Sequence, residues 1–363
     1  MRPAATIEKL GAAAYRYPTE RPESDGTLEW TATTLVTAEV EGGGKRGFGY
    51  TYADAAAAPV IAKLAPTIRG LDALDPQAAH RATRAALRNQ GTQGIGGMAL
   101  SAVDVALWDL KARLLEVPLA ALLGRARVAV PAYGSGGFCS MTDKELRDQL
   151  GGWARAGFAA VKLKIGRDPR ADPGRVRAAR ETVGDVGLMV DANGALSRKQ
   201  ALGLAEVLAG EGVVWFEEPV ATDDLEGMRL LRDRAPPGMD VAGGEYGHGP
   251  GYFRRMLEAG AVDVLQLDLT RCGGVTGFLA SAAVAAAFHV PVSSHCAPAL
   301  HAAPLCAVEG AMHAEWFHDH ARLEAALIEG APRVVDGLLA PQRDRPGHGL
   351  ELRRADAERF RVA

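Results

Sequence analysis

Seven ionisable residues in the second half of the chain recur at nearly regular intervals, each at or near the end of a short run typical of a β-strand. Neighbouring members are roughly 20 to 28 residues apart, about the length of one strand–helix unit. Ionisable side chains are depleted from strands and are seldom buried unless they are paired or bound to a metal. A single one would indicate a solvated strand end, whereas seven in register predict one common site. In chain order they are Lys164, Asp191, Glu217, Glu245, Asp268, His295 and Glu315.

The three carboxylates that follow Lys164 in this set, Asp191, Glu217 and Glu245, end three consecutive predicted strands. They provide only hard oxygen ligands, which suit Mg²⁺, with Mn²⁺ as an alternative, better than zinc. Three carboxylates at one place would repel one another without a cation. Three separate salt bridges are the alternative explanation. We predict that these residues hold a divalent metal ion.

Two candidate acid/base groups flank the predicted metal ligands. Lys162 and Lys164 alternate with Leu163, so a strand would point both lysines to the same face. Like charge and partial burial lower a lysine pKa, as a base near neutral pH requires, although two surface lysines would give the same pattern. Asp268 and His295 end neighbouring predicted strands, and the carboxylate would fix the imidazole tautomer and raise its basicity.

A divalent cation with a base on either side suits the removal of a proton next to a substrate carboxylate. The cation would stabilise the negative charge that develops when this proton leaves. Lys164 and His295 are the two predicted bases. Glu315, if protonated, would donate a hydrogen bond to the substrate carboxylate.

Eight short β-rich runs, nearly all separated by helical stretches, make up the chain from about residue 126. Strand–helix alternation predicts a parallel sheet, and eight units predict a closed β/α barrel. An open doubly wound sheet is the alternative, but no GxGxxG motif follows the first run. The runs are 128–133, 159–165, 187–191, 213–217, 241–245, 262–268, 290–295 and 314–317.

The first 125 or so residues show a different order of predicted secondary structure. Residues 27–40 and 47–52 are β-rich and flank three glycines, which predicts a hairpin. Residues 17–26 are polar and contain prolines, and we expect a loop there. Residues 99–115 have apolar side chains at helical spacing. Strands followed by helices predict an α+β domain.

These secondary-structure patterns divide the chain into three segments. We expect an N-terminal α+β domain over 1–125, a catalytic barrel over 126–330, and a turn-rich segment over 331–363 that returns to the first domain.

Composition excludes several classes of partner. The formal net charge is −3 and no long charged run occurs, so nucleic acid and membranes are not expected partners. No apolar stretch reaches the roughly 18 residues of a spanning helix, and the first residues lack the apolar core of a secretory signal. We expect a cytoplasmic protein. Its cysteines, expected as reduced thiols because none are paired at CxxC spacing, are Cys139, Cys272, Cys296 and Cys306.

At its ionisable positions the sequence resembles the enolase superfamily, and within it the mandelate racemase subgroup. The similarity extends over essentially the whole chain. The matching motifs, in chain order, are the helix 102–110, Lys162-Leu163-Lys164, Asp191-Ala192-Asn193, Glu217-Glu218-Pro219, Gly243-Gly244-Glu245, Leu267-Asp268-Leu269, Arg271-Cys272-Gly273-Gly274-Val275-Thr276-Gly277 and Ser293-Ser294-His295.

The resemblance implies a fold and a set of roles. The fold would be a modified (β/α)7β barrel with an N-terminal α+β capping domain, in a homo-oligomer. The three carboxylates become Mg²⁺ ligands, and Lys164 becomes one acid/base, with its pKa lowered by Lys162. His295 with Asp268 becomes the opposite acid/base, where muconate-cycloisomerase-like and dipeptide-epimerase-like members carry a second lysine. Glu315 becomes a hydrogen-bond donor to a small carboxylate substrate.

We expect dehydration of an acid sugar or small polyhydroxy acid to a 2-keto-3-deoxy acid. Either base would remove the α-proton, and the protonated dyad would help expel the β-hydroxyl as water. Racemisation or epimerisation at the same carbon is the runner-up, and a catalytically silent homologue with a binding role is a third hypothesis. The residues expected to bind substrate or cap the site are Asp25 with its neighbours Glu23 and Ser24, Asn193, His248, His301 and the run 317–320.

Overall fold

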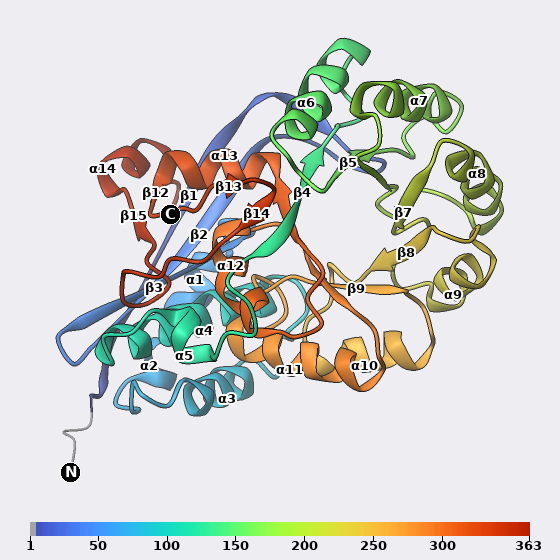
Figure 1. Cartoon of the computed structure of the whole chain (residues 1–363). Helices are drawn as coiled ribbons and strands as arrows, with labels where there is room; N and C mark the ends of the chain where they lie inside the picture. Colours follow the sequence, from blue (N-terminus) through green and yellow to red (C-terminus); the bar gives the residue numbers. More distant parts are fainter. Residues whose placement is uncertain (1–4) are drawn as a thin grey trace.

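The computed structural model describes residues 5–363, which begin with an antiparallel sheet packed against helices (Figure 1). Strands β1 (Ile7–Ser24), β2 (Glu29–Gly42) and β3 (Lys45–Tyr52) pair in that order. The helices that follow are α1 (Ala57–Lys63), α2 (Ala65–Ile68), α3 (Pro76–Ala86), α4 (Ile95–Leu114) and α5 (Leu119–Leu123). The expected α+β capping domain and its β2–β3 hairpin are confirmed.

Helix α4 lies directly on strand β3 because two glycines allow it. A Cβ at Gly47 would lie 2.0 Å from the carbonyl oxygen of Ala106, and one at Gly49 would lie 2.3 Å from that of Ala102. Any larger residue would force the helix away from the sheet. The predicted helix over 99–115 corresponds to residues 99–114 of α4.

The loop expected over 17–26 is wrong, because β1 continues to Ser24. Its pairing with β2 is irregular between Pro18 and Glu23. β1 is an edge strand, and an edge strand tolerates proline because the missing N–H would have faced away from the ladder.

The chain from Val130 to Leu327 forms a barrel of eight parallel strands with helices around it (Figure 1). Strands β4 to β10 pair in sequence order, and β11 pairs with β4. A bridge between Val292 and Ala311 joins β10 to the residues before β11, and this closes the ring. All eight predicted runs overlap a strand, and the doubly wound alternative is wrong. The strands are β4 (Val130–Gly136), β5 (Ala160–Lys164), β6 (Gly187–Asp191), β7 (Val213–Glu217), β8 (Asp240–Gly243), β9 (Val264–Leu267), β10 (Val292–Ser294) and β11 (Ala314–Phe317).

The helices alternate with these strands along the chain. They are α6 (Asp143–Arg155), α7 (Asp172–Val183), α8 (Arg198–Gly210), α9 (Leu225–Arg234), α10 (Pro250–Glu258), α11 (Gly274–Ala287), α12 (Pro298–Ala307) and α13 (His318–Leu327). None of the helices in the described part of the chain is long and apolar enough to cross a membrane.

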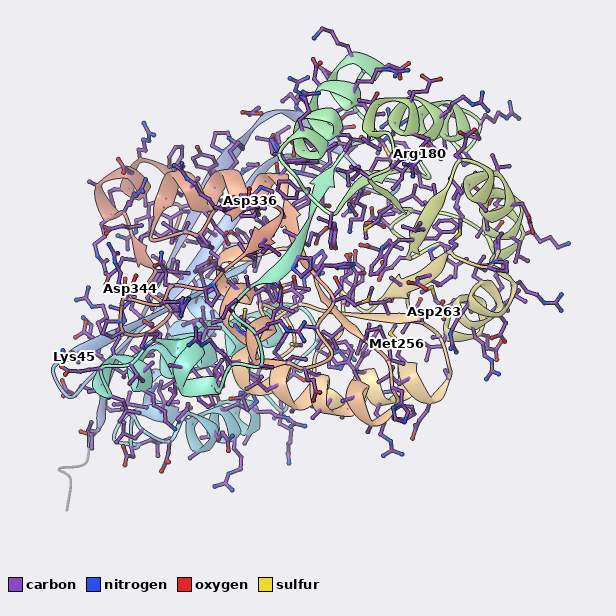
Figure 2. All side chains as sticks on the ribbon, in the orientation of Figure 1. Lys45, Arg180, Met256, Asp263, Asp336 and Asp344 are labelled. Atoms are coloured by element: carbon purple, nitrogen blue, oxygen red, sulfur yellow. The ribbon has the colours of Figure 1, made fainter. Side chains whose placement is uncertain are left out.

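The segment after α13 contacts both the barrel and the capping domain. Strand β14 (Leu338–Leu339) pairs with β4, and the backbone N–H of His348 donates to the carboxylate of Asp109 in α4. Val362 N–H donates to the carbonyl of Ala14 in β1. Lys45 and Asp344 mark this side of the molecule in Figure 2. The segment boundaries at 125 and 330 stay a prediction. The remaining short elements are β12 (Ile328–Glu329), β13 (Val334–Val335), β15 (Glu351–Leu352), α14 (Arg354–Ala357) and a 3-10 helix (Glu358–Phe360).

Candidate active site

A layer of mainly apolar side chains fills the barrel interior and supports the ionisable residues. It contains Tyr133, Ala160, Met189, Trp215, Ala242 and Val264. Successive residues of a strand point to opposite faces, so the residue two positions further along points inward again. That position is Lys162 on β5, Asp191 on β6 and Glu217 on β7. Strand geometry therefore directs these three charged groups into the barrel at its carboxyl end.

All seven predicted ionisable residues are brought to this end and are at most 7 % exposed. Glu245, Asp268 and His295 follow the last residues of β8, β9 and β10 by one or two positions. Such burial of charged groups requires ion pairs, hydrogen bonds or a metal ion.

The three predicted metal ligands converge. Ligand oxygens of Asp191, Glu217 and Glu245 lie within 4.8 Å of one another. Burial, followed by the carboxylate of Asp191, raises the pKa of Glu217 to about 8. Oε2 of Glu245 is buried and accepts no hydrogen bond from the residues described, although His295 Nε2 lies 3.4 Å away. The carboxylates of Asp191 and Glu217 repel each other, and Glu245 has an oxygen without a partner in the described part of the chain. A hard divalent cation would relieve both, so the residues fit Mg²⁺.

The lysines are more strongly paired than the sequence indicates. Lys162 Nζ lies 2.6 and 2.7 Å from the two carboxylate oxygens of Glu217, and Lys164 forms an ion pair with Asp191. Burial is the largest influence on the pKa of Lys164 and lowers it, and Lys162 also lowers it. The carboxylates of Asp191, Glu217 and Glu245 outweigh both effects and raise this pKa. The prediction of a depressed pKa considered only Lys162 and burial, and the carboxylates of the neighbouring strands oppose that depression.

Asp268 and His295 form the expected pair on the other side. His295 Nδ1 donates to Asp268 Oδ2 at 2.8 Å, which leaves Nε2 facing Glu245. The backbone N–H and hydroxyl of Thr270 both donate to the other Asp268 oxygen at 2.7 Å. Burial opposes ionisation of Asp268, but its bond to His295 and the nearby Arg271 hold its pKa well below the ordinary value. Asp268 is therefore an ionised acceptor that fixes the imidazole.

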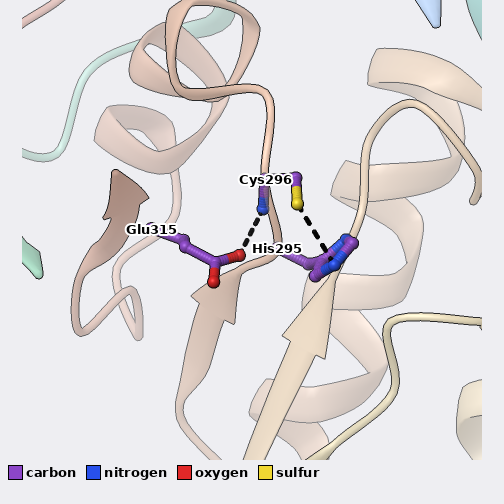
Figure 3. A group of neighbouring side chains, drawn as sticks. All are labelled: His295, Cys296 and Glu315. Atoms are coloured by element: carbon purple, nitrogen blue, oxygen red, sulfur yellow. Dashed lines mark hydrogen bonds between the residues drawn. The ribbon is translucent and has the colours of Figure 1, made fainter. Parts of the chain in front are cut away.

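Glu315 is paired with cationic and N–H donors, which opposes the protonated form that a hydrogen-bond donor would need. Its Oε1 lies 2.8 Å from Lys162 Nζ, and its Oε2 accepts the backbone N–H of Cys296 at 2.6 Å (Figure 3). Burial favours the neutral form, but Lys162 holds the pKa of this carboxyl well below its usual range. In this arrangement Glu315 orients the lysine and the loop after β10.

The predicted substrate-binding residues differ in whether their polar side-chain atoms already have hydrogen-bond partners. Asn193 is adjacent to the site, and its buried Oδ1 has no partner among the described residues. His301 has both ring nitrogens engaged, because Nδ1 donates to the carbonyls of Cys296 and Ala297 and Nε2 accepts from Leu269 N–H.

Two further candidates, Asp25 and His248, contact groups outside the carboxylate triad. Asp25 Oδ1 accepts hydrogen bonds from Thr27 and Leu28, which makes a tight turn. His248 lines a crevice between α3 of the capping domain and α10, where it contacts Tyr252. Neither His248 nor His301 has the placement expected of a substrate contact.

Two residues of the site were missed. Glu218 follows Glu217, is 1 % exposed and has φ of 35°. Burial first, and then Glu245, raises its pKa well above the ordinary value. Cys296 follows His295, and its sulfur lies 3.2 Å from His295 Nε2. Direct sequence adjacency to a predicted site residue was the available signal in both cases.

The comparisons with known proteins cover the same elements. The family model of the mandelate racemase / muconate lactonizing enzyme N-terminal domain matches residues 18–124, and that of the enolase C-terminal domain-like family matches 145–357. A 3,6-anhydro-alpha-L-galactonate cycloisomerase from Streptomyces coelicolor is 33 % identical over 95 % of this chain and 97 % of its own length. Other curated relatives are arabinonate and L-talarate/galactarate dehydratases and a hydrophobic dipeptide epimerase.

Solved structures agree over nearly the full length. A mandelate racemase/muconate lactonizing enzyme-like protein from Rubrobacter xylanophilus is 51 % identical, with a TM-score of 0.96 over 98 % of this chain and 99 % of that one. A racemase from Streptomyces coelicolor with bound magnesium is 32 % identical, with a TM-score of 0.92 over 98 % of this chain and 100 % of that one. The chain belongs to the mandelate racemase/muconate lactonizing enzyme family of the enolase superfamily.

Proposed function

We propose that this protein removes the proton α to the carboxylate of an acid sugar and eliminates the β-oxygen, acting as a hydro-lyase. The observation that carries the proposal is the placement of Lys164 and the His295–Asp268 pair beside one buried carboxylate triad. Dehydratases among the curated relatives support the substrate class. A homologue without activity would not need to keep these acid/base groups and carboxylates together, so the site favours an active enzyme.

Asp191, Glu217 and Glu245 would hold Mg²⁺, with Mn²⁺ as a substitute. When bound, the cation supplies positive charge that orients the substrate carboxylate and stabilises negative charge next to it. Magnesium in a structural neighbour supports this choice.

The protein's own groups would move the protons. Lys164 or His295 accepts the α-proton as the C–H bond breaks. His295 can do so at Nε2, because Nδ1–H is committed to Asp268. His295, once protonated, donates that proton to the β-hydroxyl, which leaves as water while a carbon–carbon double bond forms. The resulting enol tautomerises to a 2-keto-3-deoxy acid.

A second candidate keeps the first proton transfer and changes the leaving group. If the β-oxygen belongs to a ring, its departure opens the ring and no water is lost, which makes the reaction a cycloisomerisation. The full-length similarity to a cycloisomerase favours this candidate. Racemisation or epimerisation, in which the opposite base returns the proton, is supported by the racemase and epimerase among the relatives.

One experiment separates these reactions. The Mg²⁺-loaded protein is incubated in D₂O with aldonic, aldaric, 3,6-anhydro and simple 2-hydroxy acids. We expect a 2-keto-3-deoxy acid, formed with loss of water from an open-chain acid or without it from an anhydro acid. Deuterium at an inverted α-carbon would instead show racemisation.

Lys164→Ala and His295→Asn should each abolish turnover of the best substrate, and the exposed Lys144→Ala is the matched control. Full activity of either site variant, or the absence of any α-proton exchange across the panel, would refute the proposal.

We also propose that the protein acts in the cytoplasm as a homo-oligomer on a small carboxylate, without nucleic-acid or membrane partners. The composition and the family support this. Size-exclusion chromatography with light scattering and cell fractionation test it.

A further inference from the structure

We infer that His295, Cys296 and Glu315 form a second cation site, specific for a soft divalent ion such as Zn²⁺ and made of other residues than the neighbouring carboxylate triad. Ligand atoms of the three residues lie within 4.8 Å of one another, and all three are buried (Figure 3). One sulfur, one imidazole nitrogen and one carboxylate oxygen are the donor set that zinc prefers, whereas Mg²⁺ avoids sulfur.

The geometry of the first two ligands suits a common metal ion. Cys296 Sγ lies 3.2 Å from His295 Nε2. Zinc bonds to sulfur at about 2.3 Å and to nitrogen at about 2.0 Å, so in a tetrahedral site these atoms are separated by roughly 3.5 Å. A shift of a few tenths of an ångström would therefore accommodate the ion.

The imidazole is already oriented as a zinc ligand. Its Nδ1–H donates to Asp268, so the lone pair of the neutral ring is on Nε2, the atom facing the thiol. A carboxylate behind a metal-binding histidine fixes the tautomer and strengthens the ligand.

The backbone of Cys296 is held in place from both sides. Its N–H donates to Glu315, and its carbonyl accepts from His301 Nδ1. Cys296 and Ala297 have φ of 53° and 40°, a left-handed conformation that is strained for residues other than glycine and must be held by its surroundings. His301, which has no atom free for substrate, thus fixes the thiol beside the imidazole.

Binding would release the thiol proton to solvent and leave a thiolate–metal bond. It would also occupy Nε2, the nitrogen that accepts or donates a proton in the proposed function, so a soft ion would inhibit turnover. Only this inhibitory consequence rests on the proposed function.

Cd²⁺ is the probe, because cadmium–thiolate bonds give an ultraviolet charge-transfer band that oxygen ligands do not. We titrate Cd²⁺ into full-length protein kept saturated with Mg²⁺. We expect a band that saturates at one equivalent per chain, resists further Mg²⁺ and is displaced by Zn²⁺. Loss of the band on adding Mg²⁺, or no band with the unmodified chain, would overturn the inference.

Cys296→Ser and Cys296→Ala should lack the band and bind Cd²⁺ at least about 100-fold more weakly, since even partners behind a ligand contribute 10–100-fold. Cys139→Ser is the matched control and should keep the band, because Cys139 is outside the cluster. An undiminished band in Cys296→Ser would refute the assignment. The binding measurement stands even if no substrate is found, and inhibition by Zn²⁺ can be tested separately once one is known.

Discussion

The buried carboxyl of Glu324 should make the stability of the protein fall as the pH rises through neutrality. Glu324 lies in α13 and accepts hydrogen bonds from the hydroxyls of Tyr50 and Tyr52 in β3 and from Ala299 N–H in α12. Burial raises its pKa from 4.5 to about 7, against the lowering effect of these hydrogen bonds. The folded protein therefore binds this proton more tightly than the unfolded chain does.

The direction and magnitude of the change in the free energy of unfolding follow from the difference between the folded and unfolded pKa values of Glu324. The contribution is fully present below pH of about 4.5 and is lost as the pH rises through about 7. The difference between the two pKa values corresponds to about 3 kcal/mol in total, of which about 2 kcal/mol is lost between pH values of about 5.5 and 8.5. Glu324→Gln cannot titrate, so it should lack this loss.

Urea unfolding at several pH values measures the effect. The glutamine amide should also leave the Ala299 N–H without a good acceptor, at a cost of about 1–3 kcal/mol at every pH. The informative quantity is therefore the change with pH in the difference between variant and wild type. Glu226→Gln, at the exposed surface of α9, controls for the loss of one carboxylate. If the free energies of unfolding of wild type and Glu324→Gln run parallel over this range, the reasoning is wrong.

Three further outcomes test the site and its support. Asp268→Asn should lower kcat about 100-fold or more with a smaller change in KM, because His295 loses its tautomer control; equal kcat in steady-state assays would contradict this. Chelation of divalent ions should abolish turnover, and Mg²⁺ at 100 times its Kd should then raise the unfolding free energy by about 2.7 kcal/mol, measurable by calorimetry. Asp104→Ala should cost about 3–5 kcal/mol in denaturant unfolding, because buried Asp104 accepts from Thr276 and His80 across the capping-domain contacts.

The sequence could predict which residues converge, because convergence depends only on strand period and chain order. Asp191, Glu217 and Glu245 were identifiable from spacing alone, since every strand of a parallel barrel ends at the same rim. The same logic placed Lys164 and His295 at that rim. Residue type then limited the chemistry to a hard cation between two bases.

Protonation could not be predicted in this way, because it depends on partners across the barrel. The Lys-x-Lys spacing indicated a depressed lysine pKa, and burial does lower that of Lys164, but Asp191 on the next strand acts in the opposite direction. Burial similarly raises the pKa of Glu315, and Lys162 outweighs it and lowers that pKa. The role of His301 was hidden for a related reason, because its partners are backbone groups that no side-chain motif reveals.

The site also depends on the capping domain through the helix that follows the last barrel strand. His320 and Glu324 of α13 accept the backbone N–H groups of Ala297 and Ala299, which lie one and three positions after Cys296. Tyr52 of β3 stacks on His320 with ring centroids 3.4 Å apart and donates to Glu324. The left-handed turn that positions His295 and its thiol neighbour is therefore held by groups anchored to the N-terminal sheet. Because buried hydrogen bonds of this kind are costly to leave unmade, movement of that sheet would be transmitted to the imidazole. The barrel supplies the residues of the site, and the docked capping domain fixes the loop on which one of its two bases lies.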